Sequence, residues 1–184
     1  MVQLEDYAYF FVVCEGTNEE AIFNFIETHG RLRFSEYSKD YMRAHTKESK
    51  RALIQKTIEF NYDGRVGVLN IRDRKNENWD ITSRTKKLMN IRGIDIIPVV
   101  TYPEIEYLLI LSDNDCLKEW DKRKKKDKQL NPSGFCKSYY NRNVKTGEGF
   151  VDLFNGFDNF YMACARYKEM SDSRDTLCLF DLIG

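Results

Sequence analysis

The sequence has few of the residues from which zinc sites and nucleophile–histidine pairs are built. It contains only two histidines, His29 and His45, and its five cysteines show neither a Cys-x-x-Cys pair nor a Cys/His metal spacing. The glycine-rich phosphate loops GxGxxG and GxxxxGK are also absent. These absences argue against a zinc site and a histidine general base, and they make a flavodoxin-like nucleotide enzyme the weakest of the functions considered.

The sequence also lacks an excess of charge of either sign. Lys+Arg and Asp+Glu number 29 each, so the formal net charge is zero and any nucleic-acid binding needs a local basic patch. No apolar run reaches the length of a transmembrane helix, and no basic region precedes the first apolar run, so we expect neither a membrane span nor a signal peptide. Reduced cysteines then predict a cytoplasmic protein.

Three apolar stretches are typical of buried strands, and each is followed by a helical pattern. With 184 residues, 42% of them hydrophobic, the chain is long enough for a domain with a substantial core. Strands that alternate with helices predict an α/β fold with a mostly parallel sheet flanked by helices. The predicted elements are strands over 9–14, 65–71 and 94–100, helices over 18–29, 47–60 and 80–92, a helix opening at 101–106, a short strand over 32–37 and a loop over 38–46.

Several residues indicate where these elements begin and end. Asn18 can cap the first helix, and Thr82 or Asp80 can cap the helix that follows the second strand. Pro103 would lie in the first turn of the helix after the third strand. Pro98, inside that third strand, predicts an edge or irregular position in the sheet.

The composition changes after residue 112. We therefore predict an α/β core over 1–112 and a mainly helical extension over 113–184 that packs on the core. The expected parts of the extension are a charged run over 121–128 (DKRKKKDK), a turn over 131–134, a helix over 150–167 and a final short helix or strand over 177–183.

Acidic residues follow all three predicted strands. Glu15 ends the first strand, Asp73 follows the second, and Glu104 and Glu106 follow the third. Because the carboxyl ends of parallel strands share one edge of the sheet, we expect these side chains to lie close together. Carboxylate oxygens suit Mg²⁺, and a metal-activated water can cleave a phosphodiester. Basic residues beside Asp73 would hold the phosphates: Arg72, Arg74 and Lys75.

These strand ends resemble those of the TOPRIM fold, in particular the TOPRIM nucleases of bacterial defence systems (overcoming-lysogenization-defect and RloB-like proteins). In that fold one strand ends in Glu-Gly, here Glu15-Gly16, a second ends in Asp-x-Asp, here begun by Asp73, and Pro-x-x-Glu follows the next strand, here 103–106. The resemblance covers about 9–111. It implies a metal-dependent nuclease of prokaryotic or phage-related defence that uses Mg²⁺ or Mn²⁺, with Glu15 as a metal-linked or acid/base glutamate and Asp73 as the main metal ligand.

The chain departs from this pattern at one position. The second acid of Asp-x-Asp would fall at residue 75, where the chain has Lys75, a cation that would repel a second metal ion. Asp80, Glu77 or Glu106 could replace it, so the candidate metal ligands are Glu15, Asp73, Glu106 and Asp80. The alternative is a TOPRIM-like scaffold or binding subunit without a working metal site, which assembles with a partner such as an ATPase or a second copy of itself.

Each candidate also has a purely structural explanation. Glu15 could cap the first helix or pair with a neighbouring cation, and Asp73 could be a solvated turn residue. Glu104 and Glu106 would lie in the first turn of a helix, where the helix dipole favours acids, as it does Glu19. The lysines of the charged run could form a solvated helix face or bind a phosphate backbone: Lys124, Lys125 and Lys126.

Overall fold

A four-stranded parallel sheet organises the fold. The computed structural model describes residues 2–34, 39–42, 47–60, 62–73, 79–170 and 176–184. The strands lie in the order β2-β1-β3-β4, and every neighbouring pair is parallel. Their bounds are β1 Tyr9–Cys14, β2 Lys39–Met42, β3 Val66–Arg72 and β4 Ile94–Val100. The predicted α/β fold with a parallel sheet flanked by helices is confirmed.

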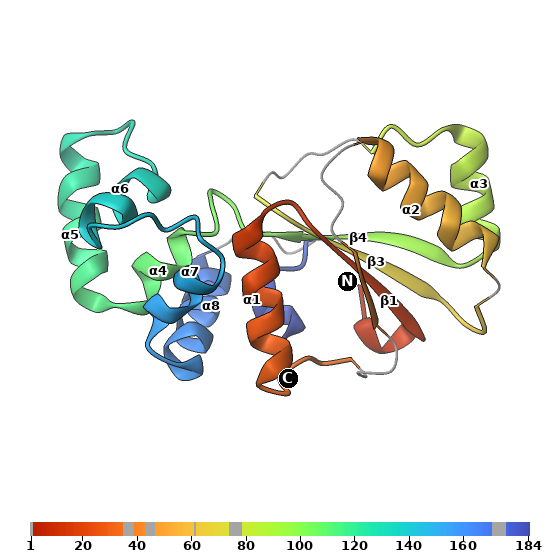
Figure 1. Cartoon of the computed structure of the whole chain (residues 1–184), viewed down its shortest axis with the longest axis horizontal. Helices are drawn as coiled ribbons and strands as arrows, with labels where there is room; N and C mark the ends of the chain where they lie inside the picture. The colour runs from red at the N-terminus through yellow and green to blue at the C-terminus, as the bar shows by residue number, and fades with distance from the viewer. Residues whose placement is uncertain (1, 35–38, 43–46, 61, 74–78, 171–175) are drawn as a thin grey trace.

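Helices cover both faces of this sheet and extend beyond one end of it (Figure 1). Helices α4 to α8 gather beyond the end of the sheet at which the chain leaves β1 and β4 (Figure 1). Helices α2 and α3 lie next to each other, away from that group (Figure 1). The α-helices are α1 Thr17–Thr28, α2 Lys47–Glu59, α3 Ser83–Ile91, α4 Tyr107–Ser112, α5 Asn114–Lys126, α6 Pro132–Tyr139, α7 Glu148–Val151 and α8 Phe157–Met170. The 3₁₀ helices are η1 Leu4–Asp6, η3 Asp152–Phe154 and η4 Leu179–Leu182. None of the helices in the described part of the chain has the length and apolar character that crossing a membrane requires.

The two faces of the sheet belong to two separate hydrophobic clusters. Side chains of a strand alternate between faces, so Phe10 and Val12 join one cluster while Phe11 and Val13 join the other. The first cluster continues through α4, α5 and α8 to Ile183, so the helical part shares one core with the sheet. The second cluster lies under α2 and α3. Burial on both faces explains why β1 and β3 are near-continuous apolar runs.

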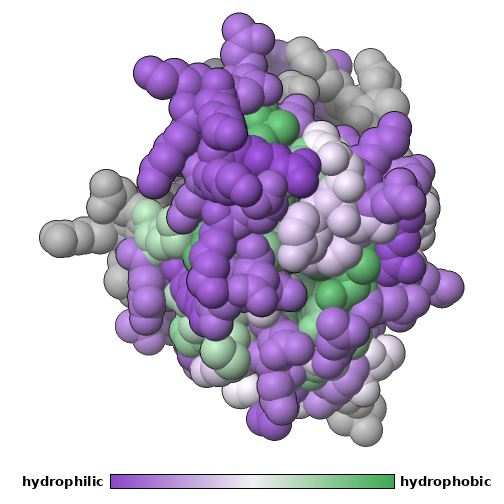
Figure 2. All heavy atoms as spheres, turned by 90° about the vertical axis from the view of Figure 1, so that its left-hand side faces the viewer, coloured by the Kyte–Doolittle hydropathy of each residue, from purple (hydrophilic) through white to green (hydrophobic). Residues whose placement is uncertain are grey.

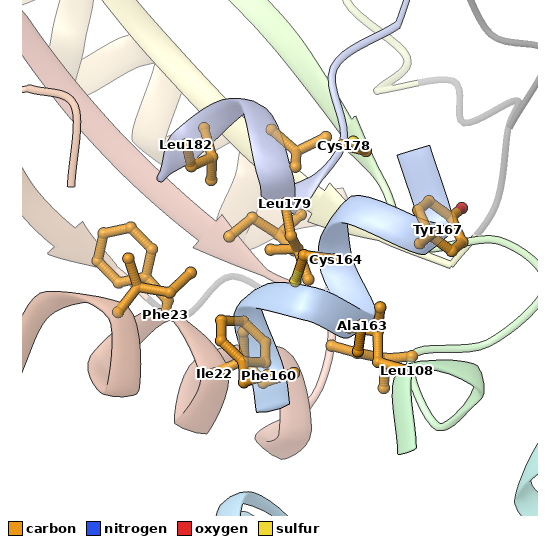
Figure 3. Close-up of a cluster of buried hydrophobic side chains, with 14 of the residues drawn as sticks. Ile22, Phe23, Leu108, Phe160, Ala163, Cys164, Tyr167, Cys178, Leu179 and Leu182 are labelled. Atoms are coloured by element: carbon orange, nitrogen blue, oxygen red, sulfur yellow. The ribbon is translucent and has the colours of Figure 1, made fainter. Parts of the chain in front are cut away.

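The C-terminal segment closes the first cluster. In Figure 3, side chains of α1 and α8 meet those of the chain end, with Ile22, Phe160, Cys164 and Leu179 packed together. All four are at most 2% exposed. Fully burying a side chain of this size contributes roughly 1.5–3 kcal/mol. The predicted final short element is therefore a 3₁₀ helix docked on the core.

The order of the strands corrects one sequence prediction. Residues 38–46 are predicted as loop, yet β2 lies within them and pairs with β1 from Phe10↔Lys39 to Val13↔Met42. The strand is polar and short (KDYM), and backbone pairing with β1 places it at the sheet edge, so no apolar pattern announces it. The strand predicted over 32–37 is wrong for its described part, where Leu32 makes only an isolated bridge to Ile183; residues 35–38 lie outside the described residues.

Three further boundaries differ from the predictions. The helix expected at 101–106 begins only at Tyr107, so Pro103 precedes it in a segment of bends and turns, with a cis peptide bond to Tyr102. The turn expected at 131–134 is instead the start of α6, capped by Asn131, whose Oδ1 accepts from the Gly134 N–H at 2.8 Å. The helix expected over 150–167 is broken by Asn155 and Gly156, which both have positive φ.

Other predictions are confirmed. Thr82 caps α3, since its Oγ1 accepts from the Thr85 N–H at 3.1 Å. Strand β4 has the predicted bounds and, as Pro98 indicates, lies at an edge of the described sheet. The five cysteines are all buried free thiols.

Candidate active site

A cavity of about 200 Å³ opens at the carboxyl edge of the sheet, between the start of α1 and the segment before α4. Most of the polar groups that surround it are carboxylates, and one lysine faces them. The lining residues are Glu15, Gly16, Thr17, Asn18, Glu19, Asp73, Glu104, Ile105, Glu106 and Lys145. We refer to it as the acid pocket.

Backbone hydrogen bonds hold the strand ends that carry these acids in register. The N–H of Glu15 donates to the Ile71 carbonyl at 3.1 Å, which ties the end of β1 to β3 two residues before Asp73. The N–H of Thr101 donates to the Arg72 carbonyl at 2.8 Å, which ties the chain after β4 to the same place. The structure therefore brings together Glu15, Asp73 and the segment with Glu104 and Glu106, as the parallel sheet predicts.

Glu19 also lines the acid pocket, and the sequence predicts it only as a first-turn acid of α1. Its side chain is 7% exposed. Burial, followed by the charges of Glu106, Glu15 and Asp73, raises its pKa to about 7, although a hydrogen bond from its own backbone N–H lowers it. The signal in the sequence is the spacing Glu15-x-x-x-Glu19 across the junction of strand and helix, which turns both acids toward one cavity.

Gly16 makes room for the Glu19 carboxylate. A Cβ at Gly16 would lie 2.7 Å from Oε2 of Glu19. Gly16 has extended backbone angles, φ −140° and ψ 178°, that any residue can adopt. The glycine of the Glu-Gly pair is therefore explained here by the space that the second glutamate occupies and not by the backbone.

Asn18 is not the helix cap that its position suggests. The N-cap residue of α1 is Gly16, and Asn18 lies inside the helix, 4% exposed. Its Nδ2 donates to Oε1 of Glu106 at 3.2 Å and to the Val144 carbonyl at 3.0 Å, and its Oδ1 accepts from the Gly147 N–H at 3.1 Å. One side chain thus fixes both a pocket carboxylate and the loop before α7.

Glu106 is the most deeply buried of the strand-end acids, at 3% exposed. Burial raises its pKa, while its own backbone N–H, the charge of Lys145 and the hydrogen bond from Asn18 oppose the rise. It is the N-cap residue of α4 and not part of a first helical turn. Glu104 accepts from the Ser133 N–H at 2.8 Å, so it ties the pocket rim to the start of α6.

Asp80 is a predicted metal ligand that the structure does not bring to the acid pocket. It pairs with Arg51, with 2.6 Å between Oδ2 and Nη2, and both side chains are 53% exposed. In this arrangement Asp80 does not line the acid pocket, so it is not placed to replace the missing second acid of Asp-x-Asp. Arg74, Lys75 and Glu77 lie outside the described residues.

Four of the predicted phosphate-binding residues are described by the structure, and none of these four lines the acid pocket. Arg72 is buried on the opposite face of the sheet, because side chains alternate along β3. Lys124 is half-buried, and its Nζ donates to the Lys128 carbonyl at 2.8 Å and the Leu130 carbonyl at 2.6 Å. Lys125 and Lys126 are exposed near the end of α5. The side of the molecule on which α5 lies is largely hydrophilic (Figure 2).

The donor groups of the acid pocket suit a hard divalent cation. Glu15, Glu19, Asp73 and Glu106 offer only carboxylate oxygens, the ligand type that Mg²⁺ and Mn²⁺ prefer. Within the described ranges, no three His, Cys, Asp or Glu side chains are already grouped as a metal site. Binding an ion would therefore require these carboxylates to turn toward one another, which flexible glutamates can do by rotating their side chains.

Comparison of the chain with family models, curated proteins and solved structures finds no match of any of the three kinds.

Proposed function

We propose that the protein is a metal-dependent nuclease, which hydrolyses phosphodiester bonds of nucleic acid at the acid pocket. The observation that carries this proposal is the convergence of five carboxylates in one cavity at the carboxyl edge of a parallel sheet: those of Glu15, Glu19, Asp73, Glu104 and Glu106. Burial and, after it, the charges of Glu106, Glu15 and Asp73 raise the pKa of Glu19, and a cation bound among these carboxylates would offset their repulsion. A bound Mg²⁺ or Mn²⁺ would supply an activated water and stabilise the charge of the departing oxygen.

The chain's own residues have separate roles in this proposal. Glu15 and Asp73, from the ends of β1 and β3, hold the ion, and Glu19 and Glu106 complete the oxygen donors. Asn18 keeps Glu106 oriented through its 3.2 Å hydrogen bond. Lys145, the cation that lines the pocket, binds a phosphate oxygen of the substrate.

Exposed cations of α5 extend this site toward a nucleic-acid strand. The last turn of α5 carries Arg123, Lys124, Lys125 and Lys126, and the negative end of the helix dipole lies beside them. Because the chain has no net charge, such a local patch has to supply the attraction for phosphates. We assign Lys125 and Lys126 to backbone contacts, and Lys124 to holding the loop after α5.

The family, setting and compartment belong to the same proposal. A TOPRIM-like nuclease of prokaryotic or phage-related defence fits the Glu15-Gly16 junction and the position of Asp73 after β3. Five buried free cysteines fit the reducing cytoplasm.

The proposal is tested by cleavage of DNA and RNA with Mg²⁺ or Mn²⁺, in the natural protein and in Glu15→Gln and Asp73→Asn. Cleavage activity should fall by about 100-fold or more in both variants, because the bound metal ion contributes on the order of several kcal/mol of transition-state stabilisation. Their melting temperatures should stay close to that of the natural protein. Glu20→Gln, on α1 but outside the pocket lining, is the matched control and should stay active. Full activity of both variants, or activity in excess EDTA, would contradict the proposal.

The second candidate is a TOPRIM-like scaffold that assembles with an ATPase or with another copy of the chain. It is favoured by the spacing of the pocket acids, no three of which are grouped as a metal site in the described ranges. Calorimetry with Mg²⁺ and Mn²⁺ separates the two functions. Heat of binding that disappears in Asp73→Asn supports the nuclease, and its absence in the natural protein supports the scaffold.

A further inference from the structure

One stretch of this neutral chain is strongly basic. Residues 122–147 contain nine lysines and arginines and a single acid, Asp127, whereas the rest of the chain contains twenty basic and twenty-eight acidic residues. The stretch covers the end of α5, all of α6 and the loop that leads to α7. Six of its exposed cations make no ion pair within the described part of the chain, and we refer to them as the cationic track: Lys125, Lys126, Lys128, Lys137, Arg142 and Lys145.

Hydrogen bonds connect the helices of the cationic track to each other and to the acid pocket. The Arg123 guanidinium donates to the Ser138 hydroxyl at 3.1 Å, which holds α5 beside the end of α6. The N–H of Ser133 donates to the Glu104 carboxylate at 2.8 Å, which holds the start of α6 at the rim of the pocket. Lys137 lies one helical turn after Ser133, on the same side of α6. The track therefore runs along α6 to the pocket.

The loop between α6 and α7 brings the last cation of the track into the acid pocket. Asn18 holds this loop at two points, through the Val144 carbonyl at 3.0 Å and the Gly147 N–H at 3.1 Å. Lys145 lies between these two points and lines the pocket. Its charge opposes the rise that burial causes in the pKa of Glu106. The side chain that orients Glu106 thus also fixes the position of Lys145.

The surface of residues 122–147 suits a polyanion better than a protein or a membrane. None of the large hydrophobic side chains that are exposed in the described ranges lies in this stretch. The side of the molecule that carries α5 and α6 is largely hydrophilic (Figure 2). Protein interfaces have an apolar core, and helices that lie on membranes insert an apolar face. Cations without exposed apolar neighbours are instead typical of surfaces that contact nucleic-acid phosphates irrespective of the base sequence.

The length of α6 indicates how much of a strand the track can cover. Its eight residues span about 12 Å, at about 1.5 Å per residue. Phosphates of one stacked strand are about 3.4 Å apart along its axis. A strand that lies along α6 therefore places about four phosphates beside the helix.

We infer that the cationic track binds the phosphate backbone of one nucleic-acid strand and leads it along α6 into the acid pocket. The inference rests on the proposed function and adds the path of its substrate. The strand extends from the scissile phosphate on the α6 side of the pocket, over Lys137 and Lys128 toward the end of α5. Binding along the track needs no metal ion, so it can be measured apart from cleavage.

Fluorescence anisotropy of labelled single strands in EDTA tests the inference. Affinity should rise steeply from two to about six nucleotides and level off beyond, because a strand has to pass about four phosphates to cover α6. The logarithm of Kd should rise with the logarithm of the salt concentration with a slope of at least about 2, since each phosphate contact of a single strand contributes about 0.7. A dinucleotide that binds as tightly as a strand of about 12 nucleotides, or an affinity independent of salt, would overturn the inference.

Two double variants remove the same charge from different places. Lys128→Gln with Lys137→Gln removes two cations of the track, and Arg84→Gln with Lys87→Gln removes two exposed cations of α3. The track variant should bind a strand at least about tenfold more weakly at 0.1 M salt, because each contact there contributes about fivefold, and its salt slope should fall by about 1.4. The α3 variant should bind as the natural protein does. Equal affinities of the two variants would overturn the inference.

Cleavage assays and competitors separate the remaining outcomes. Asp73→Asn should bind the strand in EDTA at least as tightly as the natural protein, so a protein that binds through the track but never cleaves contradicts the nuclease proposal alone. Cleavage by a protein whose track variant keeps full affinity contradicts the track alone. Polyglutamate and vesicles of anionic phospholipid should displace the strand less effectively than unlabelled strand does. Equal displacement by either would assign the track to an acidic protein or to a membrane and overturn the inference.

Discussion

Replacing Glu19 by glutamine should stabilise the protein, and only at neutral to alkaline pH. In the folded chain the pKa of Glu19 is raised from 4.5 to about 7 by burial and by the neighbouring carboxylates. Because the folded-state pKa lies above the unfolded one, the folded state binds more protons between these two values, and the free energy of unfolding falls as the pH rises through that window. Glutamine stays neutral and does not incur this loss.

The size of the effect follows from the shift. A difference of roughly 2.5 pKa units corresponds to about 3 kcal/mol, at 1.36 kcal/mol per unit, and this is an upper value because the pocket can admit water. Below pH 4.5 both proteins carry a neutral group, so this contribution vanishes there. Above pH 7 the variant should gain the full difference over the natural protein.

Urea unfolding in EDTA, followed by circular dichroism across this pH range, measures the difference directly. Glu20→Gln, one residue along α1 and outside the acid-pocket lining, is the control and should not show the same pH-dependent gain. If the unfolding free energies of Glu19→Gln and the natural protein differ by a constant amount at every pH, the reasoning is refuted. A separate measurement adds Mg²⁺ at alkaline pH. At a hundredfold excess over Kd the metal should stabilise the natural protein by about 2.7 kcal/mol, and the Glu19→Gln variant by less.

Three further predictions concern Gly16 and Asn18, which lie near Glu19, and Asp80, which does not. Gly16→Ala should change the free energy of unfolding by less than about 1 kcal/mol, because the flexible end of Glu19 can move away from the new methyl group, but it should weaken Mg²⁺ binding at least tenfold by calorimetry. Asn18→Ala should lower the free energy of unfolding by about 2–3 kcal/mol, because three buried hydrogen bonds lose their partner, whereas the exposed Asn24→Ala on the same helix should change it by less than about 1 kcal/mol. Asp80→Asn removes a surface ion pair and should cost less than about 1 kcal/mol in urea unfolding while leaving Mg²⁺ binding intact, whereas loss of binding would restore Asp80 as a ligand.

The local pattern of the sequence determines the central part of the fold. The runs over β1, β3 and β4 are apolar because these strands are covered on both faces or packed beneath helices, and such runs can be recognised without knowing the partners. Parallel strands share a carboxyl edge, so the meeting of Glu15 with Asp73 also follows from the alternation of strands and helices.

Only the tertiary structure decided the remaining features, because each depends on a partner distant in the chain. Strand β2 is polar and exists through its pairing with β1. Asn18 lies at a position typical of a cap, yet it is buried against residues 88 and 126 positions away, so its side chain joins the pocket instead. Asp80 has the right chemistry for a metal ligand but lies beside Arg51, away from the other acids.

Glu19 and Arg72 show most directly which features cannot be predicted from the sequence. A glutamate in a first helical turn is usually a solvated partner of the helix dipole, and only the packing of α1 over the sheet edge buries Glu19 among other carboxylates. Arg72 and Asp73 are adjacent in the chain, but the alternation of β3 sends them to opposite faces and into different cavities. Residue types and spacing determine which groups are available, while burial and the side of the sheet determine which of them can act together.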